Sequence, residues 1–282
     1  MVIRVAFLGP VGTYGEQAAY ELAMGSTDSN KIETLELVPQ KGISAVVEAL
    51  INDSCVGAVV PVENSVEGGV TASLDALWQH PDLSIQRALI MPIRHALLSH
   101  GSLSNIREVL SHPQALAQCN EWLIHHLPNA LQLPTHSTAE AARRVVGSTF
   151  RAAIASKQAG IDHRLYQLAY PINDIAGNCT RFLLLQKGKR NWSGPTASMA
   201  FSLKSNVPGA LLKALGCFAR RGLNMSRIES RPSKREMGEY VFFVDLDLGK
   251  AEKLSISQVV QDLLPICDHL TMFGAYFTKD LS

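Results

Sequence analysis

The pattern of apolar and polar residues divides the chain into two parts. From residue 1 to about 186, apolar runs of strand length alternate with stretches whose apolar residues recur at helical spacing. Strands are expected at residues 2–8, 32–38, 56–62, 83–91, 95–100, 107–111, 130–134, 151–156, 165–169 and 180–185, and helices at 16–24, 42–51, 71–78, 113–127 and 137–146. This alternation predicts a parallel sheet with helices on both faces, and a division near residue 80 suggests two lobes.

A different pattern follows residues 187–195, KGKRNWSGP, whose charge, glycine and proline are typical of a linker. The order strand, helix, strand, strand, helix, strand is then expected at residues 196–204, 209–222, 224–232, 239–248, 255–267 and 270–277. This βαββαβ order is the ferredoxin-like plan. Because its helices cover one face only, we expect the other face or the edge of the sheet to pair with a partner. The expected domains are residues 1–188 and 195–282.

Composition excludes several classes of protein. The chain has 282 residues, 46% of them hydrophobic, which is enough for two cores. A net charge of +1 without a basic run makes nucleic acid an unexpected partner. The five cysteines form no CxxC pair and no HExxH motif occurs, so neither disulfides nor a metal site is expected. No apolar run reaches membrane-spanning length and the N-terminal one is too short for a signal peptide, so we expect a cytoplasmic protein without membrane contact.

Polar residues gather where the expected strands end. Asn64 and Ser65 follow one strand, while Ser111 ends another and is followed by Gln118 on the next helix. Ligands of open α/β sheets bind beyond the carboxyl ends of the strands, so these side chains predict a small-molecule site. Thr13, in the segment GPVGTYG, lies at a helix start that can receive a carboxylate. The GxxGxxG spacing does not favour a dinucleotide loop, and a plain strand-to-helix turn remains an alternative.

The most specific segment is NCTRF, residues 178–182, where a threonine and an arginine begin an apolar strand. Together with GPVGTY, PVENSVEGGV, SHPQALAQC and the C-terminal GALLKAL and ESRP, it resembles prephenate dehydratases that carry a C-terminal ACT regulatory domain. The resemblance runs over almost the entire chain. It implies an α/β two-lobed, periplasmic-binding-protein-like catalytic domain followed by an α+β ferredoxin-like ACT domain.

The resemblance also implies an activity and its residues. The enzyme would be a carbon–oxygen lyase that converts prephenate to phenylpyruvate in L-phenylalanine biosynthesis, without cofactor or metal. Thr180 would donate a hydrogen bond to the leaving hydroxyl, and Arg181 beside it would stabilise negative charge or anchor the loop, both facing the cleft. Phe182 would hold the pair in place. The implied substrate-binding residues are Thr13, Asn64, Ser65, Ser111, Gln118 and Phe182.

Regulation is implied by the C-terminal part. The ACT domain would bind L-phenylalanine through Gly209, Ala210, Leu211, Asn224, Glu229, Ser230 and Arg231, in a pocket that a second ACT domain closes. A homodimer or a dimer of dimers is therefore expected. A chain ending near residue 189 would keep some activity without responding to phenylalanine. Because the first strand begins at residue 2, no chorismate mutase segment is expected ahead of it.

Two other functions remain open. Arogenate dehydratase performs the same elimination on the amino-acid analogue of prephenate. Residues 169–173 are the candidates for deciding between these two substrates. A two-lobed receptor that binds an amino acid or keto acid without turnover would share the fold.

Overall fold

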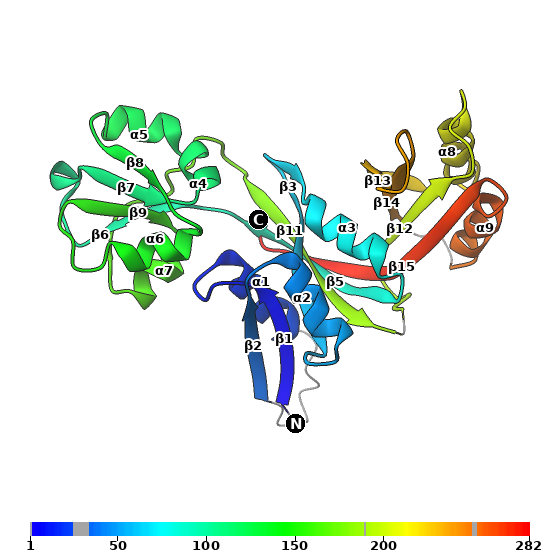
Figure 1. The fold of residues 1–282 in the computed structure, drawn as a ribbon, viewed down its shortest axis with the longest axis horizontal. Helices are drawn as coiled ribbons and strands as arrows, with labels where there is room; N and C mark the ends of the chain where they lie inside the picture. The colour runs from blue at the N-terminus through cyan, green and yellow to red at the C-terminus, as the bar shows by residue number, and fades with distance from the viewer. Residues whose placement is uncertain (1, 25–33, 189, 250–252) are drawn as a thin grey trace.

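The computed structural model describes residues 2–24, 34–188, 190–249 and 253–282, which form three bodies in a row (Figure 1). We call residues 2–92 and 179–188 the first lobe, residues 93–178 the second lobe, and residues 190–282 the C-terminal segment. Residues 32 and 33 of the strand expected at 32–38, and residue 189 of the expected linker, lie outside the described ranges. No helix in the described part of the chain is long and apolar enough to cross a membrane.

The first lobe is built on a mixed sheet. Its elements are β1 (Val2–Leu8), α1 (Tyr14–Met24), β2 (Thr34–Gln40), α2 (Ile43–Ile51), β3 (Gly57–Asn64), β4 (Gly68–Gly69), α3 (Thr71–Gln79), β5 (Leu83–Pro92) and β11 (Cys179–Lys187). β1 pairs in parallel with β2 and β3, as helical crossovers require. β11 lies antiparallel between β3 and β5, so the expectation of a parallel sheet is only partly right.

The second lobe has its own sheet, in the order β10-β6-β9-β7-β8. Its elements are β6 (Ala96–Ser99), the 3-10 helix η1 (Leu103–Asn105), β7 (Glu108–Ser111), α4 (Pro113–Ala117), α5 (Asn120–His126), β8 (Leu131–Pro134), α6 (Thr138–Arg144), β9 (Arg151–Ala155), α7 (Lys157–Asp162) and β10 (Tyr166–Ala169). The single helix expected at 113–127 is two helices that meet at Gln118 and Cys119. The chain enters this lobe after β5 and returns as β11, which confirms two crossings between the lobes.

The C-terminal segment has the predicted βαββαβ order. It consists of β12 (Thr196–Leu203), α8 (Ala210–Arg220), β13 (Asn224–Pro232), β14 (Tyr240–Asp247), α9 (Lys253–Leu263) and β15 (Cys267–Asp280), and its antiparallel sheet has the order β13-β14-β12-β15. The 14-residue β15 then leaves this sheet and pairs in parallel with β5. One ten-stranded sheet therefore runs through the C-terminal segment and the first lobe (Figure 1).

The face of the C-terminal sheet that α8 and α9 leave open is covered by the first lobe. Phe243, Phe273 and Tyr276 are buried there in one core cluster with Leu74 and Leu77 of α3. Of the two surfaces expected to pair with a partner, the face is therefore excluded because the chain's own α3 fills it, and the edge of the sheet stays a prediction. Among the described residues, β13 is the strand of this sheet that pairs on one side only.

Candidate active site

The start of β11 places two side chains on opposite sides of the sheet. Thr180 and Phe182 line a cavity between the two lobes, whereas Arg181 points away from it toward the C-terminal segment. Successive side chains of a strand alternate between faces, so neighbours in sequence cannot share one. Thr180 therefore belongs to the cleft and Arg181 does not.

Thr180 is held by Asn64, the residue opposite it on β3. Asn64 Nδ2 donates to Thr180 Oγ1 at 2.9 Å, and the residues Asn64 and Thr180 are 7% and 9% exposed. Asn64 Oδ1 in turn accepts from the backbone amides of Val66 and Glu67, which fixes the orientation of its amide. Within the residues that the structure describes, the Thr180 hydroxyl donates to no protein group. Its hydroxyl proton is therefore free for a ligand.

A row of amides continues from this pair into the second lobe. Asn64 Nδ2 also donates to Asn178 Oδ1 at 2.8 Å, and Asn178 Nδ2 donates to Gln118 Oε1 at 2.9 Å. His95 Nε2 lies 3.3 Å from the same Gln118 oxygen. Since that oxygen can only accept, Nε2 carries the proton and the lone pair of His95 is on Nδ1. The row joins both lobes through neutral groups.

His95 was not expected from the sequence, yet it is the most unusual group of the site. It is 3% exposed, lines the cavity, and its Nδ1 is buried without a hydrogen-bond partner among the described residues. Burial lowers the pKa of His95 to about 4, against a smaller opposing effect of Gln118. The ring is therefore neutral at physiological pH, and it adds no positive charge to the wall of the cavity.

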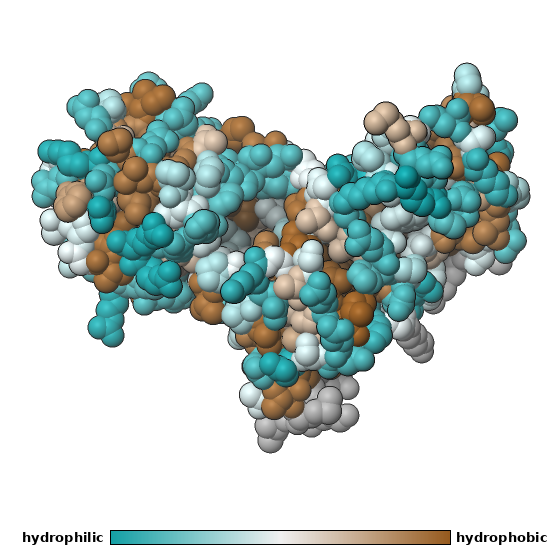
Figure 2. Space-filling view, in the orientation of Figure 1, coloured by the Kyte–Doolittle hydropathy of each residue, from teal (hydrophilic) through white to brown (hydrophobic). Residues whose placement is uncertain are grey.

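The cavity has a volume of about 430 Å³, which suits a small organic acid. The space-filling view shows the surface hollowed between the two lobes, with hydrophobic side chains in the recess (Figure 2). Thr13 and Gln118, both expected from the sequence, line it together with Tyr14 and Lys41, which were not. Lys41 is a cationic residue of this lining. Phe182 is 4% exposed and forms part of the apolar wall.

Three expected site residues lie elsewhere. Ser111 is fully buried and donates to Ile154 O at 2.6 Å, so it holds the second lobe's sheet together. Ser65 Oγ accepts from Cys179 N at 2.9 Å and secures the loop before Thr180. Arg181 pairs with Asp245 of β14. These three predictions of direct cleft roles are wrong, because the preference for strand ends identified a region and not the direction of each side chain.

Asn178 and His95 were missed for different reasons. Asn178 stands inside the quoted NCTRF segment, so its spacing of two residues from Thr180 could have identified it. His95 follows β5 in a crossing between the lobes and carries no local motif. Only the return of residues 170–178 beside it brings it to Gln118.

A second cavity, of about 670 Å³, lies in the C-terminal segment. Gly209, Ala210 and Leu211 line it, as does the loop of residues 236–239. The other expected effector residues do not line it and lie on β13: Asn224 and Ser230 are exposed, while Glu229 pairs with Arg227 and Arg231 with Asp75 of α3. The structure thus divides the expected effector set into two groups.

The shifted pKa of His95 leads to a prediction about acid stability. The unfolded state takes up a proton near pH 6.5 and the folded state only near pH 4, so this residue's contribution is full above pH 6.5 and is lost as the pH falls toward 4. Between pH 7 and pH 5 the free energy of unfolding should fall by about 2 kcal/mol because of His95. Urea unfolding at both pH values measures it.

In the His95→Gln protein, the free energy of unfolding should not show this decrease of about 2 kcal/mol between pH 7 and pH 5. The His125→Gln protein, changed at an exposed position on α5, should show the same decrease as the wild type. If the His95→Gln protein lost as much stability between the two pH values as the wild type, His95 would not be the titrating group.

The chain is similar to known proteins of one family. The family model described as prephenate dehydratase matches residues 5–190. A prephenate dehydratase of Lactococcus lactis is 35% identical over 285 residues, which cover 99% of this chain and 99% of that protein. A bifunctional chorismate mutase/prephenate dehydratase of Aquifex aeolicus is 36% identical over 276 residues, 97% of this chain and 73% of that one.

The structures are also similar. The crystal structure of a prephenate dehydratase from Arthrobacter aurescens in complex with L-Phe matches with a TM-score of 0.84 and 33% identity, covering 98% of this chain and 90% of that one. The match extends through the C-terminal segment as well as both lobes. On the family model, the identity over nearly the full length and the shared fold, this chain belongs to the prephenate dehydratase family.

Proposed function

We propose that this protein is a carbon–oxygen lyase that converts prephenate to phenylpyruvate, carbon dioxide and water. The observation that carries the proposal is Thr180, fixed by Asn64 in the cavity between the lobes with its proton free. Prephenate has a hydroxyl para to a ring carboxylate, and the loss of both makes the ring aromatic. Aromatisation drives the reaction, so the protein's task is to assist the departure of hydroxide.

Thr180 performs that task as a hydrogen-bond donor. An alcohol is too weak an acid to transfer its proton alone, so its effect depends on being held in place before the reaction begins. The bond from Asn64 occupies one lone pair of Oγ1 and directs the O–H elsewhere. The electron pair of the breaking C–C bond enters the ring, carbon dioxide leaves, and the departing hydroxide takes up a proton to become water.

The rest of the cavity suits a substrate with two carboxylates. Lys41 is a cation for the carboxylate that stays, while the neutral His95, Gln118 and Thr13 surround the rest without adding positive charge. Neutral surroundings favour decarboxylation, because a cation on the departing carboxylate would stabilise the ground state.

Turnover tests this proposal directly. Purified protein with prephenate, with chelator present and no added cofactor, should form phenylpyruvate, which is measured by its absorbance in alkali. Competition between prephenate and arogenate would establish the preferred substrate. Tight binding of prephenate without product from either compound would instead favour a receptor.

We also propose that the C-terminal segment is an ACT domain that binds L-phenylalanine and inhibits the reaction. The relative from Arthrobacter aurescens was crystallised with L-Phe, and the cavity beside Gly209 has room for an amino acid. Phe242 of β14 lines that cavity, and the same strand carries Asp245, the partner of Arg181 behind Thr180. One strand thus joins the effector cavity to the catalytic strand.

The unpaired outer edge of β13 suits association with a second copy. We propose a homodimer or a dimer of dimers, in the cytoplasm, with Asn224 and Ser230 near the contact. Sedimentation of the purified protein would measure the oligomeric state.

Replacing Gly209 with valine should weaken inhibition by phenylalanine. Gly209 caps α8 with φ +82°, a conformation that a β-branched residue resists, so the start of α8 should shift. We expect the phenylalanine concentration for half-inhibition to rise at least about tenfold. Gly222→Val, at φ +67° beyond the other end of α8, is the matched control and should respond normally. Equal loss of response in both variants would assign the effect to helix distortion alone.

A further inference from the structure

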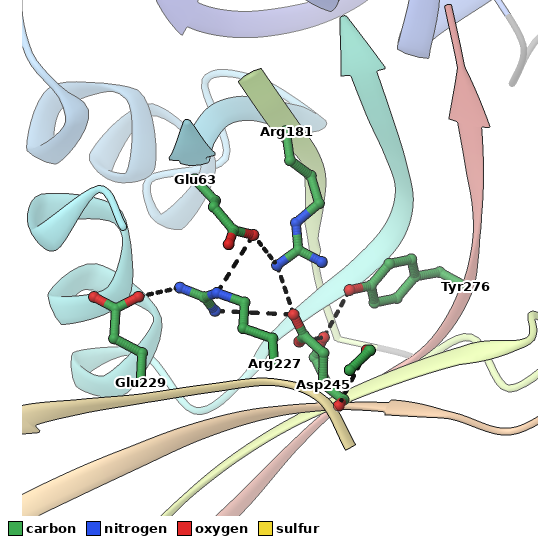
Figure 3. Close-up of polar contacts among 8 residues, drawn as sticks. Glu63, Arg181, Arg227, Glu229, Asp245 and Tyr276 are labelled. Atoms are coloured by element: carbon green, nitrogen blue, oxygen red, sulfur yellow. Dashed lines mark hydrogen bonds and ion pairs between the residues drawn. The ribbon is translucent and has the colours of Figure 1, made fainter. Parts of the chain in front are cut away.

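A cluster of charged side chains lies where the C-terminal segment packs on the first lobe (Figure 3), and Arg181, the residue after Thr180, is one of its members. Its members come from both bodies: Glu63 and Arg181 from β3 and β11, and Arg227, Glu229 and Asp245 from β13 and β14. We call these five residues the interface network.

Arg181 and Asp245 form its centre. Arg181 Nη2 lies 2.5 Å from Asp245 Oδ2 and 3.2 Å from Glu63 Oε2, and the Arg181 side chain is 16% exposed. Asp245 is 4% exposed and also accepts from Ser198 Oγ at 2.5 Å. Charges removed from water interact strongly when they are paired and leave a large penalty when one partner is removed. This contact therefore holds its two strands firmly together.

Arg227 links the carboxylates of Glu63 and Glu229 to the pair of Arg181 and Asp245. It pairs with Glu229, its Nε lies 3.5 Å from Glu63 Oε2, and its Nη1 lies 3.9 Å from Asp245 Oδ2. A Cβ at Gly69 would lie 2.1 Å from Glu229 Oε2, so β4 can approach this carboxylate only because residue 69 is glycine. The hollow beside the network measures about 10 Å³, which is too small for a ligand.

Two members of the interface network, Arg181 and Glu63, are the sequence neighbours of Thr180 and Asn64. In the register of β11 with β3, Thr180 lies opposite Asn64 and Arg181 opposite Glu63. The register shifts immediately after Arg181, which marks a β-bulge. The bulge interrupts the backbone ladder on the β3 side, whereas the register with β5 continues through Arg181 and Phe182. Side-chain contacts therefore contribute more to the position of β11 relative to β3 at this point.

We propose that Asp245 is a positioning residue for the reaction at Thr180. By holding Arg181 across the interface, it fixes the bulged start of β11 and thereby the direction of the Thr180 hydroxyl. The C-terminal segment then completes the active site although none of its described residues lines the cavity. This inference rests on the proposed function, because its effect is read in the turnover of prephenate.

Four proteins test it: the wild type, Asp245→Asn, Arg181→Gln, and the variant with both changes. Each single change should lower kcat by about 10- to 100-fold with KM changed less than about threefold, as misplacement of a catalytic group does. Each should also lower the unfolding temperature, because it leaves a charge of the network without its main partner.

The double variant separates positioning from stability. It removes both charges, so its unfolding temperature should return toward that of the wild type. If the pair positions Thr180, kcat should remain as low as in the single variants. Asp75→Asn is the matched control: it breaks the ion pairs of α3 with Arg231 and Lys234 across the same interface, but away from β11. Its kcat should stay within about twofold of the wild type.

Recovery of kcat together with stability in the double variant would overturn the inference, since the network would then serve folding alone. Single variants with normal kcat would do the same. A wild-type protein that does not convert prephenate would overturn the proposed function itself, and this outcome is distinct because it appears before any substitution is made.

Discussion

Replacing Thr180 with alanine is expected to lower kcat by roughly two to four orders of magnitude, with little change in KM. The hydroxyl assists the leaving group mainly in the transition state, so its removal affects the barrier more than substrate binding. Thr180 lies buried on β11 with Asn64 as its donor, so the position of its hydroxyl oxygen is fixed by a neighbouring strand. Steady-state kinetics with prephenate measure both constants.

Thr180→Ser should keep part of the activity, because the hydroxyl remains but its χ1 angle is less restricted than that of a β-branched residue. Ser84→Ala is the matched control. Ser84 is fully buried on β5 and donates to Gln186 O at the far end of β11, so the change removes a buried hydroxyl from the same sheet without touching the cavity. A Thr180→Ala protein with near-normal kcat would remove Thr180 from the mechanism.

A chain that ends at Gly188 is expected to lose both its cooperative unfolding and its activity. This reverses the expectation from the sequence, in which the catalytic part keeps some activity alone. The deletion removes β15 from its pairing with β5 and uncovers Leu74, Leu77 and Ile85, which are at most 2% exposed in the full chain. Each such side chain left in water costs about 1.5–3 kcal/mol, against a stability of about 5–15 kcal/mol for a whole domain.

Circular dichroism during heating, together with the prephenate assay, measures this prediction. Residues 190–282 supplied as a separate chain should restore folding and turnover in part, because they bring back β15 and the apolar face of β12 and β14. A chain of residues 1–188 that unfolds cooperatively and turns over prephenate at the wild-type rate would contradict the prediction. It would also show that the first lobe is stable with an uncovered sheet edge.

Much of the fold could be predicted from local pattern alone. The periodicities of 2 and 3.6 are set by the chain's own geometry, so they located β1, β13 and α2 within about one residue of where they lie. The charge, glycine and proline of residues 187–195 likewise predicted a linker before the C-terminal segment. The segment around Thr180 was noticed because a threonine and an arginine stand at the start of an apolar strand. The βαββαβ order followed from the same local signals.

The direction of individual side chains was predicted less well. The alternation of a strand already places Thr180 and Arg181 on opposite faces, so the expectation that both face the cleft was avoidable. Ser65 and Ser111 resemble ligand-binding residues in type and place. Whether such a hydroxyl points into a cavity or to a backbone group depends on the neighbouring strand. Here the Cys179 amide donates to Ser65, and the Ile154 carbonyl accepts from Ser111.

The sequence by itself determined the order and limits of the elements and drew attention to Thr180, the proposed catalytic residue, because these depend on residues close together along the chain. Only the tertiary structure decided that β15 returns to β5, that the open face of the C-terminal sheet packs on α3, and that Arg181 meets Asp245. These contacts join residues 64 or more positions apart in the chain, as Arg181 and Asp245 are. Local preferences carry no information about such pairings, since burial and charge pairing are settled only when distant segments pack together.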